Sequence, residues 1–198
     1  MTKSECKKAI QRGLGRGYFA VRENPERHRE AVLWACGRNL AFDTQCEGTR
    51  AWYVYQLISC YPDLAPFRDL IKEKLMSKKP DGGWAIAYFA ELLSYFAADG
   101  DPTVEAALWA KYYELLERLR GFRRKGRAMR AARDDLESIC LSLSWQEEAY
   151  ARIAGDLGAL FLENDLLDGW GVEWLFDSSL SYEQTPYDPG THVDGASA

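Results

Sequence analysis

Residues 101–120, DPTVEAALWAKYYELLERLR, decide the fold of this chain. They open with Asp101 as an N-cap residue and Pro102 at the first helical position, a combination that starts helices. Apolar residues then recur every three or four positions, which is the period of one buried helix face: Val104, Ala107, Leu108, Tyr112, Leu115, Leu116 and Leu119. The segment therefore predicts a long amphipathic helix over 102–120.

The same signals recur along the rest of the chain. Asn24-Pro25 repeats that start, and residues 44–47 and 144–147 match the capping box, in which a hydroxyl and a glutamate bind free N–H groups of a first turn. Helix-period apolar runs follow these starts, whereas no short run alternates as a strand does. We expect an all-α protein with helices near 4–22, 25–38, 44–60, 64–77, 83–98, 102–120, 127–142, 145–162 and 170–180.

Residues 99–108, DGDPTVEAAL, resemble the turn and following helix of a HEAT repeat, in which an Asp-Pro pair precedes a valine. Glu105 stands where that family commonly has an arginine. Residues 39–51, NLAFDTQCEGTRA, resemble a looser copy, with an aspartate, an arginine seven residues on, and an apolar helix after it. The resemblance implies a short right-handed α-α superhelix of antiparallel helix pairs. HEAT-like proteins bind partners on a concave helical face, and some, such as the alkylpurine DNA glycosylases, bind DNA there.

The predicted helices and the composition suggest one helical-repeat domain over residues 1–180. Residues 181–198 are rich in Ser, Gly, Pro, Asp and Tyr, so we expect a flexible acidic tail there. No apolar run approaches the roughly 20 residues of a bilayer span, so we expect no membrane partner. The five cysteines include no C-x-x-C pair, which favours reduced thiols in the cytoplasm. With only two histidines besides, we expect neither a metal site nor a cofactor.

Charge is distributed unevenly along the chain, whose net charge is −5. Residues 1–133 hold 24 basic and 16 acidic residues, a net charge of +8, whereas residues 134–198 hold one basic and 14 acidic residues, a net charge of −13. Such asymmetry indicates either an interaction surface or electrostatic pairing within the chain.

The strongest candidate binding surface is the segment 118–133, which we name the basic loop. Eight of its sixteen residues are basic and none is acidic: Arg118, Arg120, Arg123, Arg124, Lys125, Arg127, Arg130 and Arg133. It could be a solvated loop with arginines that stabilise a helix C-terminus, or it could pair with the acidic last third of the chain. It could also bind an acidic protein partner or the phosphates of a nucleic acid.

A second candidate is a possible helix-face cluster of Asp43, Glu47, Arg50 and Trp52. Spacings of four and seven residues would put the three charged side chains on one helix face, where a carboxylate pair beside an arginine could line a ligand pocket or do chemistry. The structural alternative is that Glu47 closes a capping box and pairs with Arg50.

Two further motifs have a structural and a functional interpretation. Gly13, Gly15 and Gly17 either break the first helix or bind a phosphate. The stretch 163–177, ENDLLDGWGVEWLFD, interleaves acids with aromatic residues. It either caps the end of a helical stack or is a partner-binding segment.

Taken together, these patterns favour a non-enzymatic protein-binding or scaffold module that uses a concave helical face and the basic loop. The alternative is a HEAT-like protein that binds nucleic acid. The resemblance implies that such a protein would be similar to the alkylpurine DNA glycosylases. No catalytic motif rises above background, and a histidine-dependent mechanism would have to use His28, in a charged segment, or His192, in the tail. An enzyme that uses only carboxylates stays an alternative.

Overall fold

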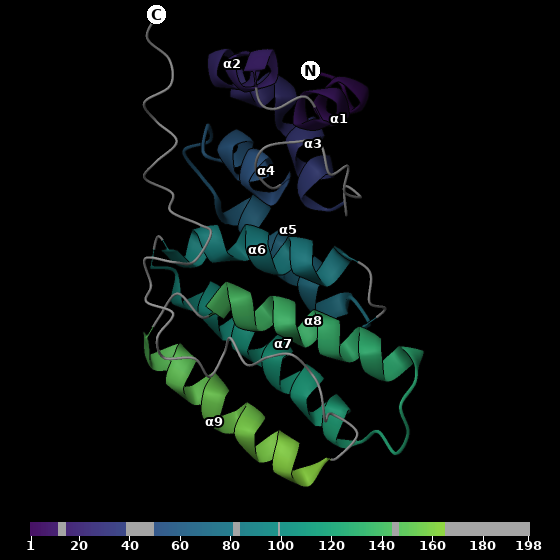
Figure 1. Ribbon diagram of the computed structural model, residues 1–198. Coiled ribbons are helices and arrows are strands. Elements are labelled where there is room, and N and C mark those ends of the chain that lie inside the picture. The colour runs from purple at the N-terminus through teal and green to yellow at the C-terminus, as the bar shows by residue number, and fades with distance from the viewer. Residues whose placement is uncertain (12–14, 39–49, 81–83, 99, 144–146, 165–198) are drawn as a thin grey trace, which may run out of the picture. The chain divides into compact units, whose positions relative to one another are not determined.

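The computed structural model describes residues 1–11, 15–38, 50–80, 84–98, 100–143 and 147–164 (Figure 1). Within these ranges the chain is all-helical, so the prediction of an all-α protein is confirmed. Its helices are α1 Lys3–Gln11, α2 Gly15–Glu23, α3 Pro25–Cys36, α4 Arg50–Ile58, α5 Ala65–Ser77, α6 Trp84–Ala98, α7 Pro102–Arg120, α8 Arg127–Leu143 and α9 Glu147–Glu163. The chain divides into two compact units, residues 1–143 and 144–198.

Most predicted helices agree with the observed bounds to within two residues. One exception is the segment predicted as one helix over 4–22, which contains two helices, α1 and α2. Another is the helix predicted over 44–60, which the structure describes as α4 from Arg50 to Ile58 only, because residues 39–49 lie outside the described residues. Gly15 begins α2 with φ at +22°, a backbone conformation that residues with a Cβ rarely adopt. The capping box at 44–47, the helix predicted at 170–180 and the tail at 181–198 lie outside the described residues.

The helices of the first unit from α3 onward form three consecutive pairs arranged in two rows (Figure 1). Each pair packs internally, as α3 with α4, α5 with α6, and α7 with α8. The first helices also contact one another in succession (α3, α5, α7), and so do the second helices (α4, α6, α8). The first helices begin at residues 25, 65 and 102, so the pairs recur at roughly the 40-residue period of helical repeats. Helices α1 and α2 pack on the first pair.

A common sequence pattern explains why these three first helices start and pack alike. Each has proline at its first or second position, where the missing N–H costs no hydrogen bond. The side chains of Asn24 and Asp101 accept hydrogen bonds from first-turn N–H groups, from Arg27 N at 3.4 Å and from Thr103 N at 2.9 Å. The seventh and eleventh residues of each helix are buried: Ala31 and Ala35, Ile71 and Leu75, Leu108 and Tyr112.

Polar side chains join the successive pairs at the helix ends. Arg68 Nη1 donates to Asp101 Oδ2 at 2.6 Å, and Lys111 Nζ donates to the carbonyl of Lys78 at 2.6 Å. Arg68 and Lys78 lie at opposite ends of α5, so α7 runs parallel to α5. In the same way the buried Tyr88 hydroxyl of α6 donates to the Ala35 carbonyl near the end of α3, at 3.0 Å. Free carbonyls at helix C-termini are thereby satisfied by side chains of later helices.

In the second unit the structure describes α9. Its Ile153, Leu157 and Leu160 recur at helical spacing and are buried. Over the described residues, no helix combines the length and the apolar character that a bilayer span requires.

Candidate functional site

The basic loop joins two packed helices of the first unit. Arg118 and Arg120 lie in the last turn of α7, and Arg127 is the first residue of α8. Gly121 ends α7 by donating its N–H to the carbonyls of Glu117 and Arg118, each at 3.2 Å. Because α7 and α8 also pack against each other, the short connection between them is anchored at both ends.

Six of the eight basic side chains are exposed, and the described part of the chain provides none of them with a hydrogen bond or an ion pair: Arg118, Arg123, Arg124, Lys125, Arg127 and Arg130. The other two have acidic partners beside them. Arg120 pairs with Glu117, and Arg133 Nη2 lies 2.9 Å from Asp134 Oδ1. Thus the accessible positive charge comes from six side chains. Glu117 on α7 and Asp134 on α8 lie at the two ends of this group.

The start of α8 is electrostatically unfavourable for folding. Basic side chains at the end of α7 interact favourably with the helix dipole, which explains Arg118 and Arg120. The first turn of α8 holds Arg127 and no acid, although a helix N-terminus prefers negative charge. Gly126 precedes it and carries no capping side chain. Helix capping therefore does not account for the cations of α8, and an anionic partner would relieve their repulsion.

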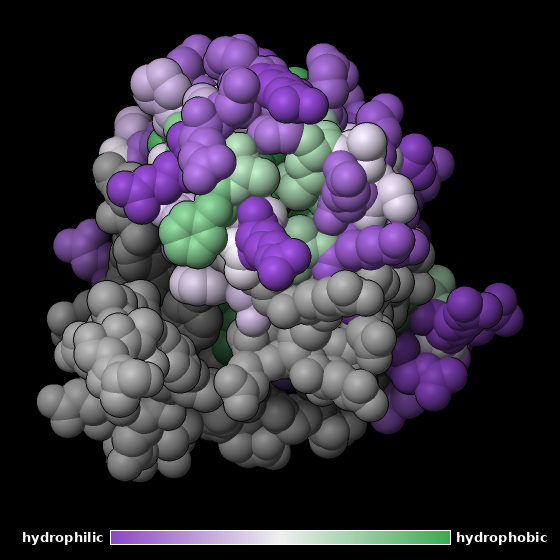
Figure 2. Space-filling model, turned by 90° about the horizontal axis from the view of Figure 1, so that it is seen from above, coloured by the Kyte–Doolittle hydropathy of each residue, from purple (hydrophilic) through white to green (hydrophobic). Residues whose placement is uncertain are grey.

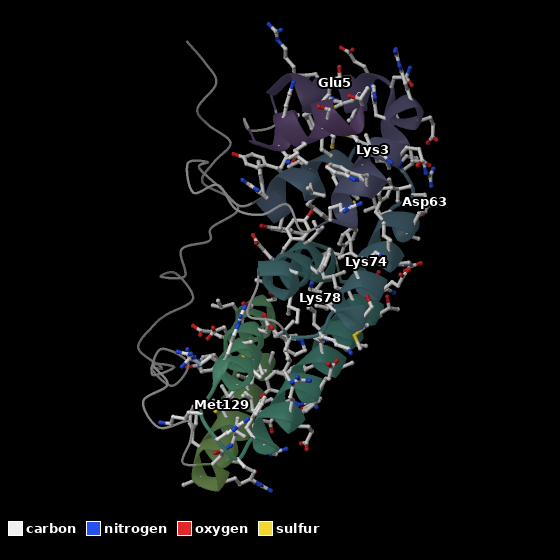
Figure 3. All side chains as sticks on the ribbon, turned by 90° about the vertical axis from the view of Figure 1, so that its right-hand side faces the viewer. Lys3, Glu5, Asp63, Lys74, Lys78 and Met129 are labelled. Atoms are coloured by element: carbon white, nitrogen blue, oxygen red, sulfur yellow. The ribbon has the colours of Figure 1, made fainter. Side chains whose placement is uncertain are left out.

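Apolar side chains hold the loop on the core while its cations stay exposed. Leu119 at the end of α7 and Met129 in the first turn of α8 are buried, the latter labelled in Figure 3. Between them Phe122 is half-buried and donates its N–H to the Leu119 carbonyl at 3.3 Å. The site therefore combines a partly accessible aromatic ring with surrounding positive charge.

The predicted helix-face cluster is described only in part. Asp43 and Glu47 lie outside the described residues, so the cluster stays a prediction. Arg50 is the first residue of α4 and is buried. Trp52 is half-buried, with its ring centroid 5.3 Å from that of Tyr53.

The glycine motif has a packing role at the residues that the structure describes. Gly17 is buried in α2, and a Cβ placed on it would lie 2.5 Å from the Cβ of Ala9 in α1. Only a glycine lets these two helices approach so closely. The interpretation as a helix break is therefore the one that this contact supports.

The described thiols and the described histidine are poorly placed for chemistry. Burial raises the pKa of Cys6 to about 11 and raises that of Cys36 well above its ordinary value. Such thiols ionise little at neutral pH and are weak nucleophiles. His28 is buried on α3 and contacts the amino group of Met1. Among the described residues, no group of three His, Cys, Asp or Glu side chains could hold a metal ion.

A second surface lies over α1 and α2, on the face that Figure 2 shows from above. The described residues on that face are mostly hydrophilic, with a small hydrophobic area among them. Phe19 of α2 is 59% exposed. A small exposed apolar area of this kind is common on protein surfaces, so this face carries less functional signal than the basic loop.

Sequence reasoning missed two polar connections between helix pairs, those of Lys111 and of Arg68, although their residue types were visible. Lys111 is fully buried and reaches both the Lys78 carbonyl and Glu114 Oε2, at 2.9 Å from the latter. A lysine on the apolar face of the predicted helix 102–120, three residues before a glutamate, was the available signal. Arg68 had no such signal, because its partner Asp101 lies in another helix pair.

Comparison with models of protein families, with curated proteins and with solved structures gives no match for this chain.

Proposed function

We propose that this chain is a non-enzymatic binding module, a short HEAT-like array of helix pairs whose basic loop binds an acidic segment of a partner protein. The observation that carries the proposal is the set of six exposed cations without acidic partners among the described residues, on a connection that packed helices anchor. Arginine next to a partly accessible aromatic residue is a common composition of binding hot spots. The half-buried Phe122 adds that element.

Two features favour a protein segment over a nucleic acid. The first is that the exposed cations end at an ion pair on each helix, Arg120–Glu117 and Arg133–Asp134, so the positive surface does not continue along either helix as a long phosphate backbone would need. The second is the net charge of −5, which opposes a long polyanion more strongly than a short acidic segment. At about 0.15 M ionic strength, charges more than ~8 Å apart are largely screened, so the basic loop acts mainly on groups that reach it.

The helix pairs supply the frame for this surface. The two-row contacts of α3–α8 support an array of stacked helix pairs, and the proposal takes this array to be a right-handed superhelix whose concave face lies beside the basic loop. The cysteines that the structure describes are free, and three of them (Cys6, Cys36 and Cys140) are buried, which supports a reducing compartment such as the cytoplasm. The proposal includes no cofactor.

The test measures binding of a fluorescent glutamate-rich peptide by anisotropy at about 0.15 M ionic strength. The loop variant carries Arg123→Gln, Arg124→Gln, Lys125→Gln and Arg127→Gln. The matched control removes four exposed positive charges elsewhere: Lys3→Gln, Lys7→Gln, Arg16→Gln and Arg27→Gln. If each cation contributes about 0.5 kcal/mol, the loop variant should bind about 30-fold more weakly than the wild type.

The control should stay within about twofold of the wild type, because its cations lie outside the basic loop. Equal losses in both variants would contradict the proposal, since binding would then follow net charge alone. A DNA or RNA duplex that binds more tightly than the peptide, with a steep salt dependence, would replace it with the nucleic-acid function.

A further inference from the structure

This inference rests on the proposed function and names the partner of the same surface. The basic loop requires an occupant that carries several acids, for the six exposed cations, and an apolar side chain, for the half-buried Phe122. A glutamate-only segment satisfies the first requirement alone. The fitting partner is therefore an acidic segment with interleaved aromatic or aliphatic residues.

This chain itself contains such a segment. Residues 163–177 hold five acids and no basic residue, and the aromatic residues Trp170, Trp174 and Phe176 alternate with those acids. The segment belongs to the part of the chain with a net charge of −13, whereas the basic loop belongs to the part with +8. The segment 163–177 therefore complements the basic loop in charge, and its aromatic residues complement Phe122.

We propose that the acidic segment 163–177 of a second copy of this chain occupies the basic loop, so that the protein associates with itself through two different surfaces. Such a contact is heterologous, because the patch on one copy differs from the patch on the other. Electrostatic attraction speeds the encounter, and burial of an aromatic residue beside Phe122 stabilises the contact.

The test measures association of the full chain by sedimentation velocity over a range of protein and salt concentrations. The wild type should self-associate near about 0.15 M ionic strength and dissociate as added salt shortens the Debye length toward about 3 Å at 1 M. The loop variant defined above should lose association. A segment variant with Asp165→Asn, Asp168→Asn and Glu173→Gln should lose it as well.

Mixing supplies the decisive result. The loop variant keeps an intact acidic segment and the segment variant keeps an intact basic loop, so an equimolar mixture should associate although each variant alone does not. The control for the segment variant neutralises three acids elsewhere, Glu23→Gln, Glu30→Gln and Glu148→Gln, and should associate like the wild type.

A wild type that stays monomeric at all concentrations would overturn the inference, and so would variants that associate unchanged. If the glutamate-rich peptide still binds the basic loop in that case, the proposed function stands and this partner alone is wrong. If the peptide also fails to bind, both proposals fail.

Discussion

Arg68 in the first turn of α5 donates a hydrogen bond from Nη1 to Asp101 Oδ2, the N-cap residue of α7, at 2.6 Å. The same carboxylate accepts hydrogen bonds from Thr103 N at 2.9 Å and Thr103 Oγ1 at 2.7 Å. One aspartate therefore starts a helix and holds it to the preceding pair. An arginine of the preceding helix pair thus binds the carboxylate that caps α7.

Replacing Asp101 should destabilise the first unit. Asp101→Ala removes the N-cap and the partner of Arg68, so we expect a loss of about 1–2 kcal/mol in the free energy of unfolding. Urea denaturation measures it. Asp69→Asn is the control, because Asp69 also binds Arg68 but is exposed, and its loss should be about 0.5 kcal/mol or less. Equal effects of the two substitutions would contradict the role given to Asp101.

The contribution of Asp101 should depend on pH. Hydrogen bonds from Thr103, together with Arg68, lower its pKa from 3.8 to about 2. Because the folded pKa is lower than the unfolded one, the stabilisation is full above about pH 5 and is lost as pH falls through 4 toward 2. The stability difference between the wild type and Asp101→Asn should therefore shrink over that interval. A difference that stays constant from pH 6 to about pH 2 would contradict this assignment.

Lys111 should be important for the α5–α7 contact. Its Nζ donates to the carbonyl of Lys78, which lies at the end of α5 and is labelled in Figure 3. The same Nζ pairs with Glu114. Lys111→Met keeps the length of the side chain but leaves that carbonyl without this donor. We expect a loss of about 1–3 kcal/mol in urea denaturation.

The matched control for Lys111 is Lys74→Met on α5, because Lys74 is half-buried and pairs with Glu73 in the same helix. It should change stability by about 0.5 kcal/mol or less. If Lys111→Met is as stable as the wild type, the buried lysine does not connect the two helix pairs as we infer.

Adding a single methyl group at Gly17 should destabilise the first unit. Gly17→Ala would place a Cβ 2.5 Å from that of Ala9, so α1 and α2 would have to separate, at a cost of about 1–3 kcal/mol. The compensating variant Ala9→Gly should restore much of the loss when it is combined with Gly17→Ala. Gly158→Ala in α9, whose added Cβ meets nothing within 4 Å, should be neutral or slightly stabilising in thermal denaturation. Equal losses at Gly17 and Gly158 would mean that the close approach of α1 and α2 is not the cause.

Local signals were sufficient to predict most of the helices that the structure describes. Asn24-Pro25 and Asp101-Pro102 marked two helix starts, and both aspartate and asparagine cap the expected first turns. The start of α2 was harder to place, because three glycines predict a weak point without saying where the new helix begins. Gly15 adopts the positive φ there.

Contacts between helix pairs could not be derived from the sequence. The partners Arg68 and Asp101 are 33 residues apart, and Lys111 binds a backbone carbonyl, which carries no sequence signal. For the basic loop, composition predicted the charge, but not which cations have acidic partners. Arg120 and Arg133 lie in helices beside Glu117 and Asp134, whereas Arg123, Arg124 and Lys125 lie in the connection between the helices.

The most direct test of the central claim is to locate where an acidic segment binds. Titrating the glutamate-rich peptide into the ¹⁵N-labelled full chain reports each backbone amide by NMR. If the basic loop is the binding surface, the largest shifts will fall on residues 118–133, will be lost in the loop variant and will persist in the control variant. Shifts concentrated on α1–α5, or shifts that the loop variant retains, would contradict the account.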